Sequence, residues 1–211
     1  MFKLTVLDND KWIAEGIAYY FAERHILTCI PETIKSKEVV NLVAGSDIVI
    51  SELSAYGRDV QFFSEILVKI SKNLPGIRLI LLTDIHVPAL IGYIQKLMPN
   101  VTILSKRSDI KVLADVVFNR DGGGNLTEDR ISIDQNTLPL TSKEFSLLRS
   151  LASGQSLVNI AKALNVSGKT VSHHRTSIIK KLNCCNVMGL TQALVDMGFS
   201  LPNTSTFTQQ L

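Results

Sequence analysis

The chain has 211 residues, a length that allows one or two domains with a buried core. Its composition, 45% hydrophobic and 19% charged with a net charge of +3, is that of an ordinary globular protein and excludes a wholly disordered chain. The sequence has no apolar run of the ~18 residues that a membrane span needs, no secretory signal pattern and only three cysteines, so we expect a cytoplasmic protein with reduced thiols and no membrane partner.

The first 118 residues alternate short apolar runs with helix-like stretches. We expect strands at residues 2–7, 47–53, 77–83 and 101–104, with a weaker one near 28–30, and helices at 12–21, 36–43, 60–72, 87–97 and 110–119. Strand–helix alternation at this spacing predicts an α/β domain with a doubly wound, parallel, five-stranded sheet. Such sheets place their sites at the carboxyl ends of strands, here around Asp8, Glu52, Thr83 and Lys106.

Residues 120–138 show no sustained period and are typical of a flexible linker. They contain three consecutive glycines, Gly122 to Gly124, and all four acidic residues that give the segment 121–139 a net charge of −3. The glycines lack the Lys-Ser/Thr or GxGxxG pattern of a phosphate-binding loop.

From Leu140 the pattern is purely helical. Thr141 and Glu144 fit a capping box that opens a helix ending at residue 152, and further helices are expected at 157–164, 169–182 and 187–197. The second and third, joined by a three-residue turn, predict a helix-turn-helix within an all-α, four-helix domain. We therefore expect domains at 1–119 and 139–199, with a linker at 120–138 and a tail at 200–211. Residues 140–211 carry a net charge of +5, so a polyanionic partner would meet the second domain.

The helix at 169–182 has an apolar face and a basic face. At about 100° per residue, the apolar stripe holds Val171, Ile178, Ile179 and Leu182. The opposite face is small, polar and basic, without any acidic residue, and holds Lys169, Ser172, His173, Thr176 and Lys180. Short donors of this kind reach base edges in the major groove and lysines reach phosphates, whereas a merely solvated face usually mixes both signs of charge.

Residues 140–198 resemble the LuxR-type helix-turn-helix of the NarL/FixJ class of bacterial transcription regulators. The shared residues are Glu144, Leu148, Gly154, Ile160, Ala161, Leu164, Val166, Ser167, Thr170, Val171, His174, Ile178, Lys181 and Leu182. The resemblance implies that Ser172, His173 and Thr176 face bases of double-stranded DNA. It also implies that Lys169, Thr170, Lys180 and Lys181 approach phosphates. His174 faces the buried side and is interpreted as structural, while Arg175 lies at the core edge and is either structural or a DNA contact.

The first domain resembles the receiver domain of response regulators, a flavodoxin-like fold. Such a domain holds Mg²⁺ on an acidic pair after the first strand and phosphorylates an Asp after the third, aided by a Thr or Ser and a Lys. The corresponding residues here are Asp8 and Asn9, Glu52, Thr83 and Lys106. The second metal carboxylate is missing and Glu replaces the acceptor Asp, so the resemblance implies a degenerate receiver without metal, cofactor or enzymatic activity. Glu52 either pairs with Lys106 and mimics the phosphorylated state or belongs to a vestigial pocket.

The sequence thus predicts a cytoplasmic, sequence-specific transcription regulator that is independent of aspartyl phosphorylation. The resemblance implies a homodimer, or a heterodimer with a related regulator, on pseudo-palindromic DNA. Leu190, Leu194 and Met197 form an apolar stripe that we expect at the dimer contact, and Trp12 fits either a core or a subunit interface. The alternatives are a phosphorylation-controlled response regulator and an adaptor that acts beside a related regulator.

Overall fold

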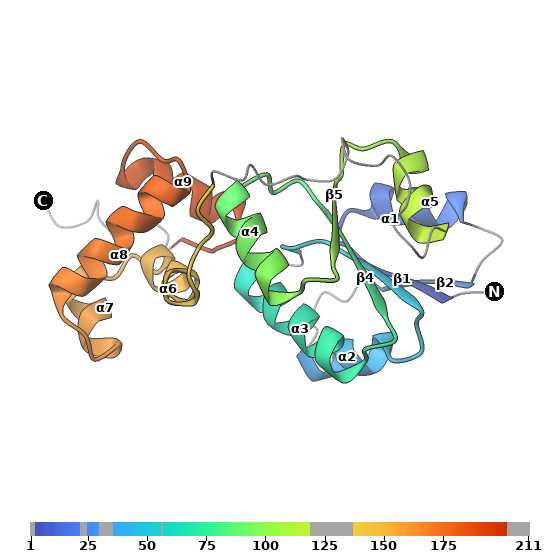
Figure 1. The fold of residues 1–211 in the computed structure, drawn as a ribbon, viewed down its shortest axis with the longest axis horizontal. Coiled ribbons are helices and arrows are strands. Elements are labelled where there is room, and N and C mark those ends of the chain that lie inside the picture. The colour runs from blue at the N-terminus through green and yellow to red at the C-terminus, as the bar shows by residue number, and fades with distance from the viewer. Residues whose placement is uncertain (1–2, 22–24, 30–35, 56, 119–136, 202–211) are drawn as a thin grey trace, which may run out of the picture.

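Five parallel strands form the centre of the first domain. The computed structural model describes residues 3–21, 25–29, 36–55, 57–118 and 137–201. Within them β1 (Lys3–Leu7), β2 (His25–Cys29), β3 (Ile48–Ser51), β4 (Arg78–Thr83) and β5 (Thr102–Ser105) pair in the order β2-β1-β3-β4-β5 (Figure 1). The predicted doubly wound sheet is confirmed. The weak second strand begins at His25, three residues before the expected 28–30.

Helices cover both faces of this sheet. One face carries α1 (Lys11–Tyr20) and α5 (Ile110–Phe118), and the other carries α2 (Ser36–Val43), α3 (Val60–Asn73) and α4 (Pro88–Leu97) (Figure 1). Successive residues of a strand point to opposite faces. Accordingly Ile48 and Ile50 pack with the core under α1 and α5, while Val49 packs with the core under α3 and α4. The inner residues of the strands are therefore mostly apolar, and Asp8, Glu52, Thr83 and Lys106 lie at or just after the carboxyl ends of four strands.

The second domain consists of four helices, each of which begins at a side-chain cap. They are α6 (Ser142–Ala152), α7 (Leu157–Ala163), α8 (Gly168–Lys181) and α9 (Val187–Asp196). Thr141 and Glu144 form the predicted capping box of α6, and the Ser156 and Ser167 hydroxyls cap α7 and α8. The α7–turn–α8 unit is the predicted helix-turn-helix. Of the expected linker, residues 120–136 lie outside the described residues.

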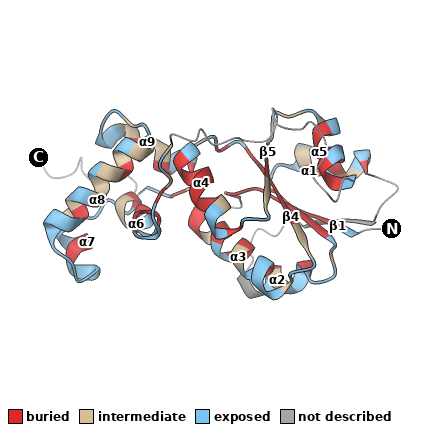
Figure 2. Cartoon of the chain, in the orientation of Figure 1, coloured by how far each residue is buried: buried red, intermediate tan, exposed pale blue. Residues whose placement is uncertain are grey.

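The two domains share one apolar core. Helix α6 packs on α3, and a single cluster of buried side chains runs from Val60 and Leu90 of the first domain to Leu148 and Met197 of the second. Figure 2 shows buried residues in α3 and α4 on one side of this junction and in α6 on the other. The helix-turn-helix domain is therefore packed against the α3–α4 side of the first domain.

Candidate DNA-binding helix and receiver pocket

The predicted pocket at the carboxyl edge of the sheet is assembled around one lysine. Asp8 follows β1, Glu52 follows β3, Thr83 ends β4, and Lys106 follows β5. Lys106 Nζ lies 2.7 Å from Asp8 Oδ2 and 2.9 Å from Glu52 Oε2. Burial alone would lower the pKa of Lys106, but its hydrogen bonds to Asp8 and Glu52 and the charges of these carboxylates raise it. The ammonium is therefore bound between two buried carboxylates.

The remaining polar atoms of this pocket are also used within the chain. Glu52 Oε1 accepts a hydrogen bond from Leu53 N–H at 2.7 Å, and Thr83 Oγ1 accepts one from Ile85 N–H at 3.1 Å. Asp8 Oδ1 accepts from Asp10 N–H at 2.9 Å. The two carboxylates of the pocket, Asp8 and Glu52, are thus both bound to Lys106 and to backbone N–H groups rather than directed toward a metal ion.

The metal-binding pair of a receiver is not reproduced. Asn9 is exposed, and the Asp10 carboxylate instead accepts hydrogen bonds from Trp12 N–H and Ile13 N–H as the N-cap of α1. Among the described residues there is no group of three His, Cys, Asp or Glu side chains that would hold a metal ion. A divalent cation prefers several carboxylate or carbonyl oxygens, so this donor set does not fit Mg²⁺.

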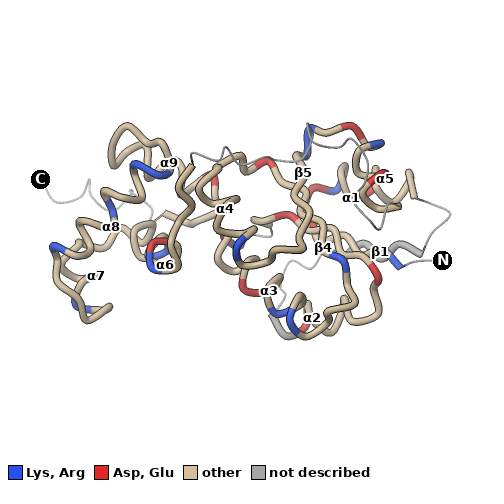
Figure 3. The backbone as a smooth tube through the Cα atoms, in the orientation of Figure 1, with Lys and Arg blue, Asp and Glu red and all other residues tan. Residues whose placement is uncertain are grey.

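Helix α8 presents the predicted basic face to solvent. Lys169, Thr170, His173, Thr176 and Lys180 are exposed and Ser172 is half-buried, while Val171 and Ile178 of the opposite face are buried. The helix contains no acidic residue, as the charge-coloured backbone shows (Figure 3). It therefore has a solvent-facing surface on which positive charge is unopposed.

Two hydroxyl groups on this face are oriented by the helix itself. Thr176 Oγ1 donates to Ser172 O at 3.1 Å, which leaves its lone pairs to accept from an incoming donor. Thr170 Oγ1 lies 2.8 Å from Ser167 Oγ at the N-cap. His174 and Arg175 are both half-buried, and the buried Arg175 Nε has no hydrogen-bond partner within the described chain.

Lys181 points inward and is not free for DNA. Its Nζ lies 2.7 Å from Glu144 Oε2 and donates to Pro139 O at 3.0 Å, and only 15% of its side chain is exposed. The prediction that Lys181 approaches a phosphate is therefore wrong for this structure. The Lys181 side chain reaches Glu144 on α6, and a helical wheel of α8 alone does not show a residue of another helix.

Glu144 joins the start of α6 to the end of α8. Its carboxylate accepts hydrogen bonds from Thr141 N–H, Lys181 Nζ and Ser177 Oγ, the last at 2.6 Å. Burial would raise the pKa of Glu144, but these hydrogen bonds, first those from Lys181 and Ser177, lower it to about 2. The sequence identified Glu144 as a capping residue and missed its role in holding α8.

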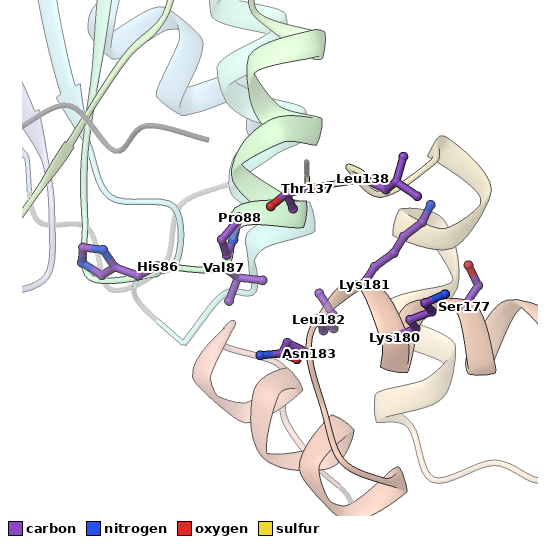
Figure 4. A pocket seen from close by; sticks show the side chains of 10 residues that line it. All are labelled: His86, Val87, Pro88, Thr137, Leu138, Ser177, Lys180, Lys181, Leu182 and Asn183. Carbon is purple, nitrogen blue, oxygen red and sulfur yellow. The ribbon is translucent and has the colours of Figure 1, made fainter. Parts of the chain in front are cut away.

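A cleft lies between the receiver-like domain and the end of α8. It has a volume of about 680 Å³ and extends from the β4–α4 connection to the last turn of α8 (Figure 4). Its lining residues are His86, Val87, Pro88, Thr137, Leu138, Ser177, Lys180, Lys181, Leu182 and Asn183. His86 Nε2 lies 3.1 Å from Ser105 Oγ, so this histidine has a polar partner in its own domain.

The apolar stripe of α9 is used inside the chain. Leu190 and Leu194 are 2% exposed and Met197 is fully buried, so the prediction that these three side chains form a dimer contact is wrong. Helix α9 contacts α6 and α8, and the three side chains belong to the buried cluster that both domains share. The exposed apolar residues of α9 are instead Val187, Met188 and Val195. Trp12 is 85% exposed, which excludes the core alternative for this residue.

Comparison with known proteins agrees with this geometry. Residues 138–194 match the family described as "Bacterial regulatory proteins, luxR family". The C-terminal domain is a LuxR-family domain. The whole chain is also similar to the response regulator protein VraR of Staphylococcus aureus (strain Mu3), with 24% identity over 204 residues that cover 92% of this chain and 94% of VraR. The VraR of strain N315 matches to the same extent.

Solved structures share the fold over nearly the whole length. RcsB from Salmonella enterica serovar Typhimurium, bound to promoter P1flhDC in the presence of the phosphomimetic BeF3−, matches with a TM-score of 0.62 at 23% identity and covers 92% of this chain and 98% of RcsB. RcsB bound to promoter rprA gives 0.59 at 22% identity, with 93% and 99% covered. The chain thus shares with RcsB the order of a receiver-like domain followed by a helix-turn-helix domain. No helix in the described part of the chain is long and apolar enough to cross a membrane.

Proposed function

We propose that the protein is a sequence-specific DNA-binding transcription regulator. Residues 139–199 would bind double-stranded DNA, and the receiver-like domain at 1–119 would serve protein association. The observation that carries this proposal is the exposed, acid-free face of α8, which combines short polar side chains with lysines. The LuxR-family match and the DNA-bound RcsB structures of the same fold support it.

The proposed base-reading residues lie in the middle of α8, and the phosphate contacts flank them. His173, Ser172 and Thr176 offer donors and acceptors of the length that a helix in the major groove requires. Lys169 and Thr170 at the start of α8 would bind DNA phosphates on one side of these bases. Lys180 in the last turn of α8 would bind a phosphate on the other side. Lys181 is omitted from this set because Glu144 already binds it.

We propose that the regulator acts as a dimer through the exposed face of α9. Val187, Met188, Thr191 and Val195 fall within about 100° of one another on this helix and carry no charge. A second copy, or a related regulator with a similar face, would bury these side chains and present two α8 helices to a pseudo-palindromic site. Light scattering of the pure protein should give a dimer, and Met188→Asp should give a monomer, with exposed Asn159→Asp on α7 as control.

The proposal also holds that aspartyl phosphorylation does not control this regulator. The Glu52 carboxylate is bound to Lys106 and to Leu53 N–H, and the donor set does not fit Mg²⁺. A nucleophile displaced by one methylene from the Asp position loses the in-line geometry that phosphoryl transfer needs.

Selection of random duplexes by the full chain tests the DNA-binding function. We expect one enriched motif, bound far more tightly than a scrambled duplex, with an affinity that falls steeply between low and physiological salt. Equal binding of the selected and scrambled duplexes would contradict sequence recognition. No binding to any duplex at low salt would favour the adaptor alternative.

A further inference from the structure

Backbone contacts fix the LuxR-family domain on the receiver-like domain. Val60 N–H, the first amide of α3, donates to Met197 O at 3.0 Å, directly after α9. Leu140 N–H, just before α6, donates to Ala89 O of α4 at 2.9 Å. Because the first amides of a helix have no acceptor within it, the Val60 bond exists only while the two domains are in contact.

Side chains reinforce this contact at its rim and in its centre. The Arg149 guanidinium of α6 binds the Asp59 carboxylate through two hydrogen bonds, of 3.1 and 2.7 Å. In the centre, the rings of Tyr93 and Phe145 have centroids 4.4 Å apart, and the buried Gln61 Nε2 donates to Phe145 O. Aromatic packing surrounded by polar anchors gives the contact one defined geometry.

Gly198 shows how closely the two backbones approach. Its φ is +82°, and a Cβ atom there would lie 2.1 Å from Ser54 Oγ, 3.1 Å from Arg58 O and 3.2 Å from Asp59 Cα. Both the backbone conformation and the space exclude a side chain at this position. Gly198, two residues beyond the end of α9, thus lies directly against the connection between β3 and α3.

That connection begins in the receiver pocket. We call its described residues, 52–55 and 57–60, the junction segment. At one end Glu52 binds Lys106 at 2.9 Å, and Leu53 behind it is fully buried. Ser54 Oγ then donates to Arg58 O at 3.2 Å, which bends the segment toward its other end at Asp59. The pocket and the domain contact are therefore the two ends of one short, internally bonded stretch.

We propose that the Glu52–Lys106 ion pair sets, through the junction segment, the orientation in which the LuxR-family domain is held on the receiver-like domain. In this orientation Lys169, His173 and Thr176 of α8 remain exposed. The pocket thus retains a link to the DNA-binding domain that requires no phosphoryl transfer. The inference deepens the proposed function, on which it rests for the role of α8, but the contact itself is measured without DNA.

Amide hydrogen exchange of the full chain tests this coupling. The reporter is Val60 N–H, and the references are Ile91 N–H, bonded to Val87 O within the receiver-like domain, and Phe145 N–H, bonded to Thr141 O within the LuxR-family domain. We expect Glu52→Gln to speed exchange at Val60 about tenfold, because it leaves a buried charge half-paired, while both references stay unchanged.

One further variant perturbs the other end of the junction segment, at Asp59, and a second serves as its control. Arg149→Gln should speed Val60 exchange about fivefold, since its ion pair with Asp59 is half-exposed. Lys143→Gln is the matched control, because Lys143 lies on the same helix and has no ion pair with any residue that the structure describes, and it should change nothing.

Three results of these exchange measurements would overturn the coupling. Unchanged exchange at Val60 in Glu52→Gln overturns the coupling, as does a rise that is equal at Val60 and Ile91, which would mean that the ion pair only stabilises its own domain. Rapid exchange at Val60 in the natural chain would show that the domains are not held together and would also overturn it. A chain that shows the expected pattern but binds no DNA would keep the coupling and refute the proposed function.

Discussion

Replacing Glu144 by Gln removes one charge from the centre of the LuxR-family domain and preserves the shape of the side chain. In the natural chain the Glu144 carboxylate accepts from Thr141 N–H, Ser177 Oγ and Lys181 Nζ. The amide nitrogen of Gln is a donor, so it would face at least one of these donors without an acceptor between them. Lys181, which is largely buried, would lose its counter-charge.

The magnitude follows from the pKa of this carboxyl group. Glu144 titrates at about 2 in the folded chain, against the usual 4.5 in an unfolded one. That difference corresponds to about 3 kcal/mol of folding free energy at neutral pH. Because the folded pKa is the lower one, the contribution is fully present above pH 4.5 and is lost as the pH falls toward about 2.

Urea unfolding followed by circular dichroism measures the effect. At pH 7 we expect Glu144→Gln to lower the free energy of unfolding by about 3 kcal/mol with an unchanged denaturant slope. The difference between the two proteins should shrink as the pH falls below 4.5, because Glu144 of the natural chain then becomes protonated. Exposed Glu15→Gln is the control and should change the free energy by less than about 0.5 kcal/mol. A loss of that small size for Glu144→Gln, or a difference that does not depend on pH, would refute the reasoning.

Three further predictions concern DNA and phosphate. Lys169→Ala and Lys180→Ala should each weaken binding to all duplexes and lower the salt dependence of the affinity by about one phosphate contact. Fluorescence anisotropy titrations at several salt concentrations measure this, and an unchanged salt slope would exclude the contact. His173→Ala should cost about 1–3 kcal/mol on the selected site and little on a scrambled one, whereas equal losses would mean that His173 only positions the helix. Incubation with Mg²⁺ and a small phosphodonor should give no mass increase. Glu52→Asp alone should restore little labelling, and adding Asn9→Asp should restore more, while stoichiometric labelling of the natural chain would establish the phosphorylated alternative.

The sheet and its polar edge were predictable because they depend on local periodicity. Apolar runs at regular spacing give buried parallel strands, and the parallel arrangement alone brings Asp8, Glu52, Thr83 and Lys106 to one edge. The N-caps of the second domain were equally local signals. The start of the weak strand at 25–29 was misplaced in the prediction because no Gly, Pro, Asn or Asp directly precedes it.

Contacts between distant segments were not predictable from the same patterns. An apolar stripe such as that of Leu190, Leu194 and Met197 shows that a helix face is buried, but it does not distinguish burial in the same chain from burial in a partner. Asp59 and Arg149 lie 90 residues apart, and neither periodicity nor spacing relates them. Lys181 was misassigned for a related reason, since its partner Glu144 lies on another helix.

The charge balance of the receiver pocket bears on whether Glu52 mimics a phosphorylated state. Asp8 and Glu52 already give the single ammonium of Lys106 two carboxylates, all three largely buried. Adding a phosphoryl group there, without a bound cation, would place about two more negative charges in a poorly solvated space. Glu52 instead holds Lys106 directly, so the position of this lysine no longer depends on phosphate. Because the Glu52–Lys106 pair is proposed to set the orientation of the LuxR-family domain, Glu52→Ala should lower DNA affinity, and an unchanged affinity would identify the pocket as vestigial.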